Sequence, residues 1–419
     1  MKTQATTPEA SLEELSMADA AVASCPFKYY EKMRHEDPVH RDPGLGYYWV
    51  AKRDDVLAAS RDWENFTSDH GLQQRRSFGP KAQKIFEASG MEVVGTLVQS
   101  DPPRHDDYRR VGVNVFTPQR VEEITPHIAD IINELIDDFS GEREIDFVSR
   151  FAQLLPATVV CDEYGFPRED RARFKHWTDG IILIQTPGIA EDEEVELTHR
   201  IIECYRYLEK YIEKAAQNPS GRVLYSIATM NRKDGTPFSM NERISMAIAV
   251  FVGGNETTVN MLASGIYRLA TMPELQQALR DDPGKIPAFV EELLRLDGSV
   301  QALVREAARD TEFGGKQIAA GTPVILCTGS ANRDESHWPE PDEFRLDRPR
   351  AQSHLTFGAG KHICIGAHVA RRELNLAFRL LLERLGTIRL QDPDAPSPYL
   401  PLPYFRAIAE LPIAFDPIR

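Results

Sequence analysis

The chain contains few cysteines, and they are scattered along it. Five occur in 419 residues, their number is odd, and none forms a C-x-x-C pair. Small extracellular domains that depend on disulfides carry even numbers of closely spaced cysteines. The cysteine content therefore excludes a disulfide framework. It is typical of a reducing compartment, and we expect a cytoplasmic location.

Long apolar segments are also missing. The longest one, residues 244–254, is too short to cross a bilayer and runs directly into Asn255 and Glu256. Residues 1–14 contain acidic side chains and lack the apolar core of a signal peptide. We therefore expect neither a membrane anchor nor a secretion signal.

Positive charge is in deficit. Lys and Arg number 49 against 64 Asp and Glu, which gives a net charge of −15. A chain of this charge is not expected to bind nucleic acid, because it would repel the phosphate backbone. With 42% hydrophobic and 27% charged residues and no repeats, the composition is that of an ordinary folded protein.

The most informative feature that is present is a glycine-rich run around Cys364. It reads F-G-A-G-K-H-I-C-I-G over residues 357–366. Gly358, Gly360 and Gly366 permit backbone conformations and close approaches that other residues would block. Such a loop can bring a flat macrocycle close to one sulfur atom.

A helix is predicted directly after Cys364. Apolar residues keep i, i+3, i+4 spacing from Ala370 to Leu385, and Gly386 is the expected stop. The positive end of a helix dipole stabilises a thiolate, so Cys364 is a candidate ligand of a haem iron. A buried structural cysteine is the alternative for a single cysteine, and the glycines and the helix argue against it.

A second signal lies in a long helix predicted from Ser239 to about Ala270. Ser239 and Glu242 have the spacing of a capping box. The helix contains Gly253-Gly254-Asn255-Glu256-Thr257-Thr258, and each glycine costs roughly 1 kcal/mol relative to alanine. One interpretation is a kink that makes room for oxygen, with Glu256 and Thr257 supplying hydrogen bonds and protons. A helix crossing that needs small residues explains the pattern equally well.

Weaker signals involve ionic side chains. Glu292 and Arg295 are spaced i, i+3 and can pair on a helix, although such pairs contribute little on a surface. Several cationic donors could bind the two carboxylates of a haem, while each by itself could be an ordinary polar residue. These donors are His105, Arg109, Arg305 and His362.

These motifs together resemble the cytochrome P-450 monooxygenases. Residues 357–366 match the haem-binding signature F-G-x-G-x-H-x-C-x-G at every defined position. Residues 253–258 are similar to the distal motif [A/G]-G-x-[D/E]-T-[T/S], with Glu256 where many bacterial members carry Asp. Glu292 and Arg295 match the family's E-x-x-R. The resemblance extends over residues 20 to 415.

The resemblance implies a mainly α fold. We expect a single large cytochrome P-450 domain, with a triangular helical core and small β-sheets at its edges. Residues 1–16 are expected to be a flexible leader and residues 17–419 the haem-thiolate domain. The expected state is a monomer.

The resemblance also assigns roles to individual residues. The cofactor would be haem b, with the Cys364 thiolate as axial ligand and O2 as co-substrate. Thr257 and Glu256 would activate oxygen and deliver protons, and Arg348 would join Glu292 and Arg295 in a buried network that braces the cysteine loop. The remaining cofactor-binding residues would be Phe357, Gly358 and Gly366 in that loop, with His105, Arg109, Arg305 and His362 on the propionates.

The implied reaction inserts one oxygen atom from O2 into a small apolar substrate, by hydroxylation or epoxidation. A haem-thiolate sensor or carrier without turnover is the alternative, and the Glu256–Thr257 pair argues against it because a sensor needs no proton relay. By family position, the candidate substrate-pocket residues are Val94, Leu97, Ile182, Ala249, Val252, Gly253, Val300, Leu303 and Phe405.

Electrons are expected from a separate protein, because no flavin or ferredoxin module fits in this length. The resemblance points to a [2Fe-2S] ferredoxin with an NAD(P)H-dependent reductase. A cluster of basic residues could dock such an acidic partner, or it could be ordinary solubilising charge. The cluster consists of Arg110, Lys361, Arg371 and Arg372.

Overall fold

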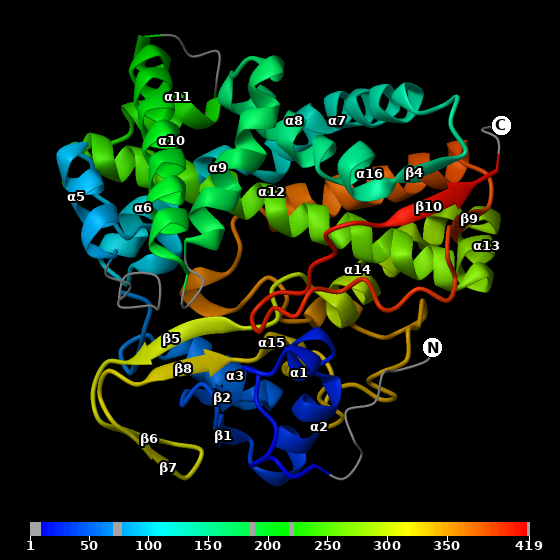
Figure 1. Ribbon diagram of the computed structural model, residues 1–419, viewed down its shortest axis with the longest axis horizontal. Helices are drawn as coiled ribbons and strands as arrows, with labels where there is room; N and C mark the ends of the chain where they lie inside the picture. The colour runs from blue at the N-terminus through cyan, green and yellow to red at the C-terminus, as the bar shows by residue number, and fades with distance from the viewer. Residues whose placement is uncertain (1–9, 70–77, 185–188, 218–221, 417–419) are drawn as a thin grey trace. The chain divides into compact units, whose positions relative to one another are not determined.

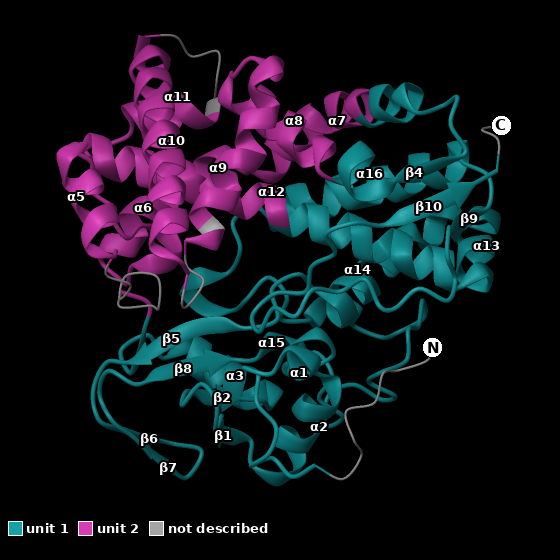
Figure 2. Cartoon of the chain, in the orientation of Figure 1, with its two compact units in different colours: residues 1–67, 132–152, 257–419 teal, residues 68–131, 153–256 magenta. Residues whose placement is uncertain are grey.

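The computed structural model describes residues 10–69, 78–184, 189–217 and 222–416. The chain groups into two compact units (Figure 2). Unit 1 comprises residues 1–67, 132–152 and 257–419, and unit 2 comprises residues 68–131 and 153–256. Each unit is described by itself below.

The structure is mainly helical, as expected (Figure 1). None of the helices in the described ranges combines the length and the apolarity that crossing a membrane requires. The helices are α1 Ala20–Ser24, α2 Phe27–Glu36, α3 Arg53–Arg61, α5 Pro80–Ala88, α6 Arg104–Val115, α7 Pro118–Asp138, α8 Leu154–Tyr164, α9 Arg171–Leu183, α10 Glu191–Gln217, α11 Arg222–Thr229, α12 Met240–Thr271, α13 Pro273–Asp281, α14 Ile286–Asp297, α15 Thr328–Ala331 and α16 Ala367–Arg384.

The strands of the described residues all belong to unit 1 and form small sheets. One sheet has the order β1-β2-β8-β5-β3, a second β4-β10-β9, and a third is the hairpin β6-β7. Within the first sheet β2 and β8 are parallel, and the other pairs are antiparallel. The strands are β1 Val39–Arg41, β2 Tyr48–Val50, β3 Phe66–Thr67, β4 Glu144–Asp146, β5 Leu303–Ala307, β6 Thr311–Phe313, β7 Lys316–Ile318, β8 Pro323–Leu326, β9 Ile388–Leu390 and β10 Pro412–Phe415.

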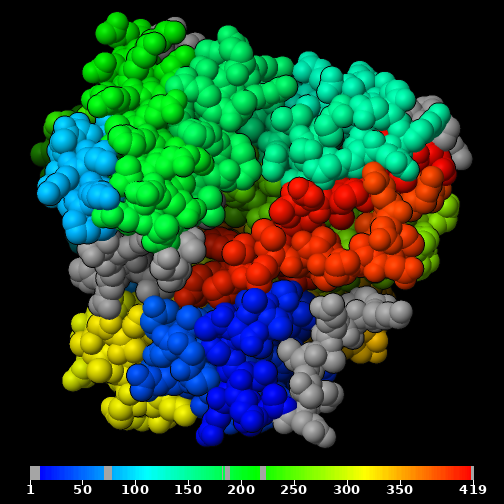
Figure 3. All heavy atoms as spheres, viewed as in Figure 1, coloured from blue at the N-terminus to red at the C-terminus, as the bar shows by residue number. Residues whose placement is uncertain are grey.

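The first sheet of unit 1 contributes to two apolar clusters. Val39 of β1 and Ile318 of β7 share one cluster, against which Phe313 of β6 packs. Figure 3 shows this hairpin, in yellow, beside the blue N-terminal segment on the surface of the unit. The last three residues of β8, 324–326, are apolar and buried, which is typical of a central strand covered on both faces.

The described part of the expected leader is packed. Leu12, Leu15 and Met17 are buried in a cluster with Tyr29 and Tyr30 of α2. Burial of these apolar side chains stabilises residues 10–17 in unit 1, so residues 10–16 do not form the flexible leader that we expected. Residues 1–9 lie outside the described residues.

Unit 2 is held together largely by aromatic rings. Phe174 of α9 contacts Phe251 of α12 at a ring-centroid distance of 5.0 Å. Trp177 of α9 lies 4.8 Å from Tyr207 of α10. Aromatic contacts bury a large apolar area and add specific geometry. They fix α9 and α10 against the part of α12 that precedes Glu256.

The long helix α12 starts where the capping box predicts. The Ser239 backbone amide donates to Glu242 Oε2 over 2.8 Å, and the Glu242 amide donates to Ser239 Oγ over 3.2 Å. Both bonds satisfy donors that a helix N-terminus would leave open. The helix continues to Thr271 without interruption across Gly253 and Gly254. The expected start and length are confirmed, whereas the kink stays a prediction.

Candidate active site

The loop before α16 is folded tightly around Cys364. The Cys364 amide donates to the Phe357 carbonyl over 2.8 Å. Gly358 and Gly360 have φ values of +72° and +68°, a region that strongly favours glycine. A Cβ atom on Gly360 would also lie only 2.6 Å from the Ser60 carbonyl oxygen. The glycine spacing therefore serves the backbone conformation that presents the cysteine.

Cys364 lies just before the N-terminus of α16, as predicted. The helix starts at Ala367 with Gly366 as its N-cap, and a Cβ on Gly366 would lie 4.0 Å from Cys364 Sγ. Cys364 is exposed, and the neighbouring Ile363 side chain is 47% exposed. An accessible thiol beside an accessible apolar side chain and near the positive end of a helix dipole fits the proximal ligand of a haem.

Strand β5 lies beside this loop. A Cβ on Gly358 would be 3.6 Å from Leu303 Cδ1. Arg305, two residues further along the strand, projects to the same face as Leu303. Arg305 is buried, and His362 is half-buried in the loop itself. Unit 1 therefore supplies two of the expected cationic donors near the cysteine loop, and their chemistry fits carboxylate groups.

The predicted ionic network behind the loop is confirmed. Glu292 is fully buried, and its carboxylate accepts two 2.8 Å bonds from Arg295. Arg348 Nε donates to the same carboxylate over 2.7 Å, and the Arg345 amide does so over 3.1 Å. Buried charges need such complete pairing, because each one alone would be costly.

Asn332 connects this network to the cysteine loop. Arg295 Nη1 donates to the Asn332 carbonyl over 2.8 Å. The Asn332 side chain in turn accepts from the Leu355 amide over 2.7 Å and donates to Thr356 Oγ1 over 2.9 Å. Leu355 and Thr356 directly precede the glycine-rich run. The network thus braces the loop, and sequence reasoning did not identify Asn332 as the connecting residue.

Arg371 forms an ion pair inside unit 1 that the sequence did not indicate. Its Nε and Nη2 atoms donate to the Glu291 carboxylate over 2.6 and 3.0 Å, and its guanidinium lies 4.6 Å from the Phe357 ring centroid. Burial opposes the charge on Glu291, but hydrogen bonds from His354 and Arg371 lower its pKa to about 2. Arg371 therefore supports the cysteine loop from inside unit 1, while Lys361 is exposed.

Glu256 lies in the unit 2 part of α12, facing α9. Burial raises the pKa of Glu256 above its usual range; Asp179 adds to this rise and Lys175 opposes it. The Lys175 and Asp179 side chains pair with each other and remain 45% and 30% exposed. A half-buried carboxyl with a raised pKa close to solvent-accessible charges can both take up and release a proton.

Thr257, the other residue of the predicted pair, is half-buried. Gly253 and Gly254 are exposed, and a Cβ on Gly253 would meet no atom within 4 Å. A Cβ on Gly254 would lie 3.9 Å from Val160 Cγ2 of α8, so open space is found beside Gly253 and a neighbouring helix beside Gly254.

The two remaining cationic donors lie on α6 of unit 2. The helix begins at Arg104, directly after the Asp101-Pro102-Pro103 sequence. His105 is buried and Arg109 is half-buried. Their i, i+4 spacing places them on one face of the helix. Arg110 donates to the Asn231 carbonyl within unit 2, so at least part of its hydrogen-bonding capacity serves the fold.

The substrate-pocket candidates differ in exposure. Val300 and Leu303 are half-buried in unit 1, and Phe405 is 42% exposed. In unit 2 Leu97 is buried and Gly253 is exposed, whereas Val94, Ala249 and Val252 are half-buried. Ile182 belongs to α9, and its side chain lies outside the described part of the structure.

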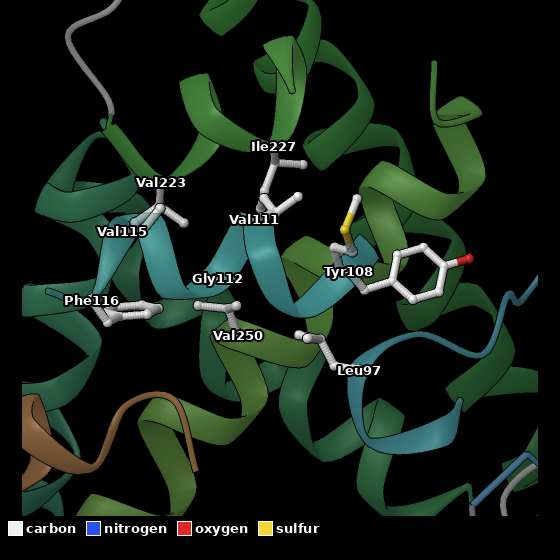
Figure 4. Close-up of a pocket in the computed structure, with 10 residues that line it drawn as sticks. Leu97, Tyr108, Val111, Gly112, Val115, Phe116, Val223, Ile227 and Val250 are labelled. Carbon is white, nitrogen blue, oxygen red and sulfur yellow. The ribbon is translucent and has the colours of Figure 1, made fainter. Parts of the chain in front are cut away.

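A small cavity in unit 2 involves one of these candidates, Leu97. Figure 4 shows its lining, which comes mainly from α6, α11 and α12 and includes Val111, Ile227 and Val250. At about 10 Å³ it has room for roughly one water molecule, and residues with apolar side chains form most of its lining.

Sequence reasoning missed Glu373, a buried carboxyl in α16. Its Oε2 atom has no hydrogen-bond partner among the described residues, and burial raises its pKa to about 8. Glu373 stands on the face that also carries Ala370 and Ala377. A charged residue on an otherwise apolar helix face is the sequence pattern that indicates such a buried carboxyl.

Glu373→Gln is expected to make the protein more stable at alkaline pH. The neutral carboxyl contributes stability that is fully present below the unfolded pKa of about 4.5 and is lost as the pH rises through about 8. The full shift corresponds to at most about 5 kcal/mol, and local relaxation reduces this to about 2–3 kcal/mol. Urea unfolding at pH 5 and pH 9 measures the difference.

Glu383→Gln, on the exposed side of the same helix, is the matched control and should show no such pH dependence. An equal gain at pH 5 and pH 9 for Glu373→Gln would mean that shape, and not protonation, causes the effect.

Comparisons with known proteins identify the family of the chain. The family model for cytochrome P450 matches residues 193–284 and 285–400. The chain is 31% identical to cytochrome P450 monooxygenase PikC of Streptomyces venezuelae, over 98% of this chain and 96% of that protein. It is 36% identical to mycinamicin IV hydroxylase/epoxidase of Micromonospora griseorubida, over 92% and 94%.

A solved structure is also similar to this chain. CYP109E1 from Bacillus megaterium, in complex with testosterone, matches with a TM-score of 0.81 and 28% identity, over 94% of this chain and 98% of that one. An exposed cysteine in a glycine-shaped loop, the buried Glu292–Arg295–Arg348 network and these matches lead to one conclusion. The chain belongs to the cytochrome P450 family and is an oxidoreductase.

Proposed function

We propose that this protein is a monooxygenase that hydroxylates or epoxidises an apolar organic substrate, with electrons from a separate donor protein. The observation that carries the proposal is the presentation of Cys364 as an exposed thiol at the N-terminus of α16. A haem b bound there through the thiolate would supply the cleavage of the O–O bond. The remaining chemistry depends on residues of this chain.

Arg305 and His362 would hold the haem carboxylates from unit 1, and His105 and Arg109 are proposed for the same role. Phe357, Gly358 and Gly366 would shape the surface against the ring. Support for this assignment comes from the buried position of Arg305 on the strand face that also carries Leu303.

Proton delivery is assigned to Glu256 and Thr257. The raised pKa of Glu256 brings it closer to neutral pH, where a group exchanges protons most effectively. Lys175 and Asp179 are accessible to solvent and can resupply the proton. The Thr257 hydroxyl, on the next residue, would supply a hydrogen bond and a proton on the side of the haem where oxygen is used.

The substrate is expected to be apolar where it is oxidised. The candidates Val300, Leu303 and Phe405 are apolar and accessible in unit 1, so they offer contact without charge. Testosterone, bound by CYP109E1, is a largely apolar molecule of this kind. The name of the mycinamicin IV enzyme includes both hydroxylase and epoxidase, the two outcomes proposed here.

The donor is proposed to be a [2Fe-2S] ferredoxin that an NAD(P)H-dependent reductase serves. Lys361 in the cysteine loop and Arg372 on α16 would attract its acidic surface. Arg371 is not part of this proposal, because it pairs with Glu291.

Two measurements test the proposal. The reduced protein with carbon monoxide should show the strongly red-shifted Soret band of thiolate-ligated haem. NADPH should be consumed in a substrate-dependent way only when a ferredoxin and its reductase are both added. A shifted band without any turnover would favour a sensor or carrier, and an unshifted band would contradict the proposal entirely.

Thr257→Ala is expected to uncouple electron use from product formation. Loss of the hydroxyl removes a hydrogen-bond and proton donor, so product per NADPH should fall by about tenfold or more, with hydrogen peroxide released instead. The carbon monoxide spectrum should not change. Measurement of product, peroxide and NADPH in one assay decides the point.

Thr271→Ala is the matched control, since this exposed threonine ends the same helix and bonds only backbone carbonyls. This variant should form as much product per NADPH as the wild type does. If Thr257→Ala were equally well coupled, another donor would supply the proton.

A further inference from the structure

The C-terminal loop of unit 1 carries an unusually accessible aromatic residue on a rigid support. Phe405 is 42% exposed. The backbone on either side of it is bound to the segment after α14: the Gln301 amide donates to the Tyr404 carbonyl over 2.9 Å, and the Arg406 amide donates to the Ser299 carbonyl over 2.8 Å. Large apolar side chains that stay accessible on a fixed backbone commonly mark binding surfaces.

The segment after α14 connects Phe405 with the strand that lies beside the cysteine loop. It forms an antiparallel bridge with Val300. Three residues of extended chain, or roughly 10 Å, separate Val300 from Leu303. Leu303 contacts the Gly358 region of the cysteine loop. Phe405 is therefore connected, through residues 300–303, to the strand that flanks the cysteine loop.

A buried ion cluster lies under the loop. Asp297, the last residue of α14, is fully buried, and its Oδ1 atom accepts from Arg406 Nε over 3.2 Å. Its Oδ2 atom pairs with Arg268 in the last turn of α12. The Arg406 guanidinium also lies 3.3 Å from the ring centroid of Tyr399, at the base of the loop. The Arg406 side chain is thereby fixed on two sides.

Neighbouring charges support the ionised state of Asp297. Burial acts against it, but Arg268 and Arg406 lower the pKa of Asp297 to about 2. Arg333, which donates to the Leu296 carbonyl over 3.1 Å, adds a further positive charge. The cluster consequently persists throughout the physiological pH range, and it holds together α12, α14 and the loop.

We propose that Asp297 and Arg406 are positioning residues that hold Phe405 as a rigid wall of the substrate site. The inference rests on the proposed function. Removal of one partner of a buried ion pair leaves an uncompensated charge, so the Asp297–Arg406 pair restrains the loop at Arg406. Phe405 then contributes shape selectivity, because a fixed ring accepts some apolar groups and excludes others.

Two spectroscopic ligands test this proposal. Imidazole needs only the haem iron, whereas 4-phenylimidazole adds a phenyl group that must fit the apolar pocket. Phe405→Ala and Arg406→Gln should both weaken the binding of 4-phenylimidazole relative to that of imidazole, by about three- to tenfold. In the double variant the two losses should not add, because both act through one ring.

Arg406→Lys keeps the positive charge next to Asp297 and should recover part of the affinity for 4-phenylimidazole. Hydrogen exchange of the amides in residues 399–408 should accelerate in Arg406→Gln and not in Phe405→Ala. Arg389→Gln, which breaks the exposed pair with Asp416 in the same C-terminal region, is the control. It should change the affinity for neither ligand.

The possible failures are distinct. If the wild type bound no imidazole, the proposed haem function would fail. If imidazole bound normally and the 4-phenylimidazole ratio stayed constant in Arg406→Gln and Arg406→Lys, the positioning role would be wrong. Additive losses in the double variant would likewise contradict it, because the ion pair would then act independently of Phe405.

Discussion

Cys364→Ser is expected to abolish both the red-shifted carbon monoxide band and all substrate oxidation. Serine has nearly the same shape as cysteine, so the loop should fold, but its hydroxyl does not provide a thiolate. The hydrogen bond from the amide of residue 364 to the Phe357 carbonyl involves only the backbone and should persist. Spectra of the reduced protein with carbon monoxide, together with product assays, measure the effect.

Cys25→Ser provides the control, since Cys25 is a partly exposed cysteine after α1, far along the chain from the loop. It should retain the band and full turnover. A Cys364→Ser protein that kept the shifted band would show that another residue ligates the iron, and the assignment of the site would be wrong.

Glu292→Gln is expected to lower the free energy of unfolding by about 3–5 kcal/mol, because it leaves two buried arginines without their counter-charge. Arg295 and Arg348 both donate to this carboxylate within unit 1. Since Asn332 passes the support on to Leu355 and Thr356, the haem content of the purified protein should also fall. Urea unfolding and the haem-to-protein ratio report the two effects separately.

A matched control exists for this variant. Glu31 pairs with Lys28 at the same three-residue separation, but both side chains are exposed. Glu31→Gln should cost less than about 1 kcal/mol and leave the haem content unchanged. A similarly small loss in Glu292→Gln would mean that the backbone carbonyls around Arg295 suffice to stabilise it.

Local sequence patterns predicted the elements that carry the site. The capping box at Ser239 correctly located the start of α12, and the apolar spacing after Cys364 correctly indicated α16. Glu292 and Arg295 were expected to pair because they are three residues apart on one helix. Each of these predictions depends on residues that are close along the chain, where backbone geometry determines which atoms meet.

Predictions that depended on distant partners were less reliable. For Arg371 the sequence left a docking role and ordinary solubilising charge open, and it did not indicate the pairing with Glu291, a residue 80 positions away. Residues 10–16 were expected to be a flexible leader, yet Leu12 and Leu15 are buried. Which charge meets which partner, and which apolar side chain is covered, depends on how separate elements pack, and sequence spacing does not contain that information.

The amino-acid sequence by itself contained the motifs on which the proposed chemistry rests: a cysteine in a glycine-rich loop, followed by a helix, and an acid–alcohol pair in a long helix. Tertiary structure alone decided the supports of that chemistry. It left Glu373 Oε2 buried without a hydrogen-bond partner among the described residues, and it brought Asp297 to Arg406, 109 residues away, beneath the exposed Phe405. The physical reason is that ligand chemistry resides in single side chains and short loops, whereas burial and ion pairing arise only when distant segments pack together.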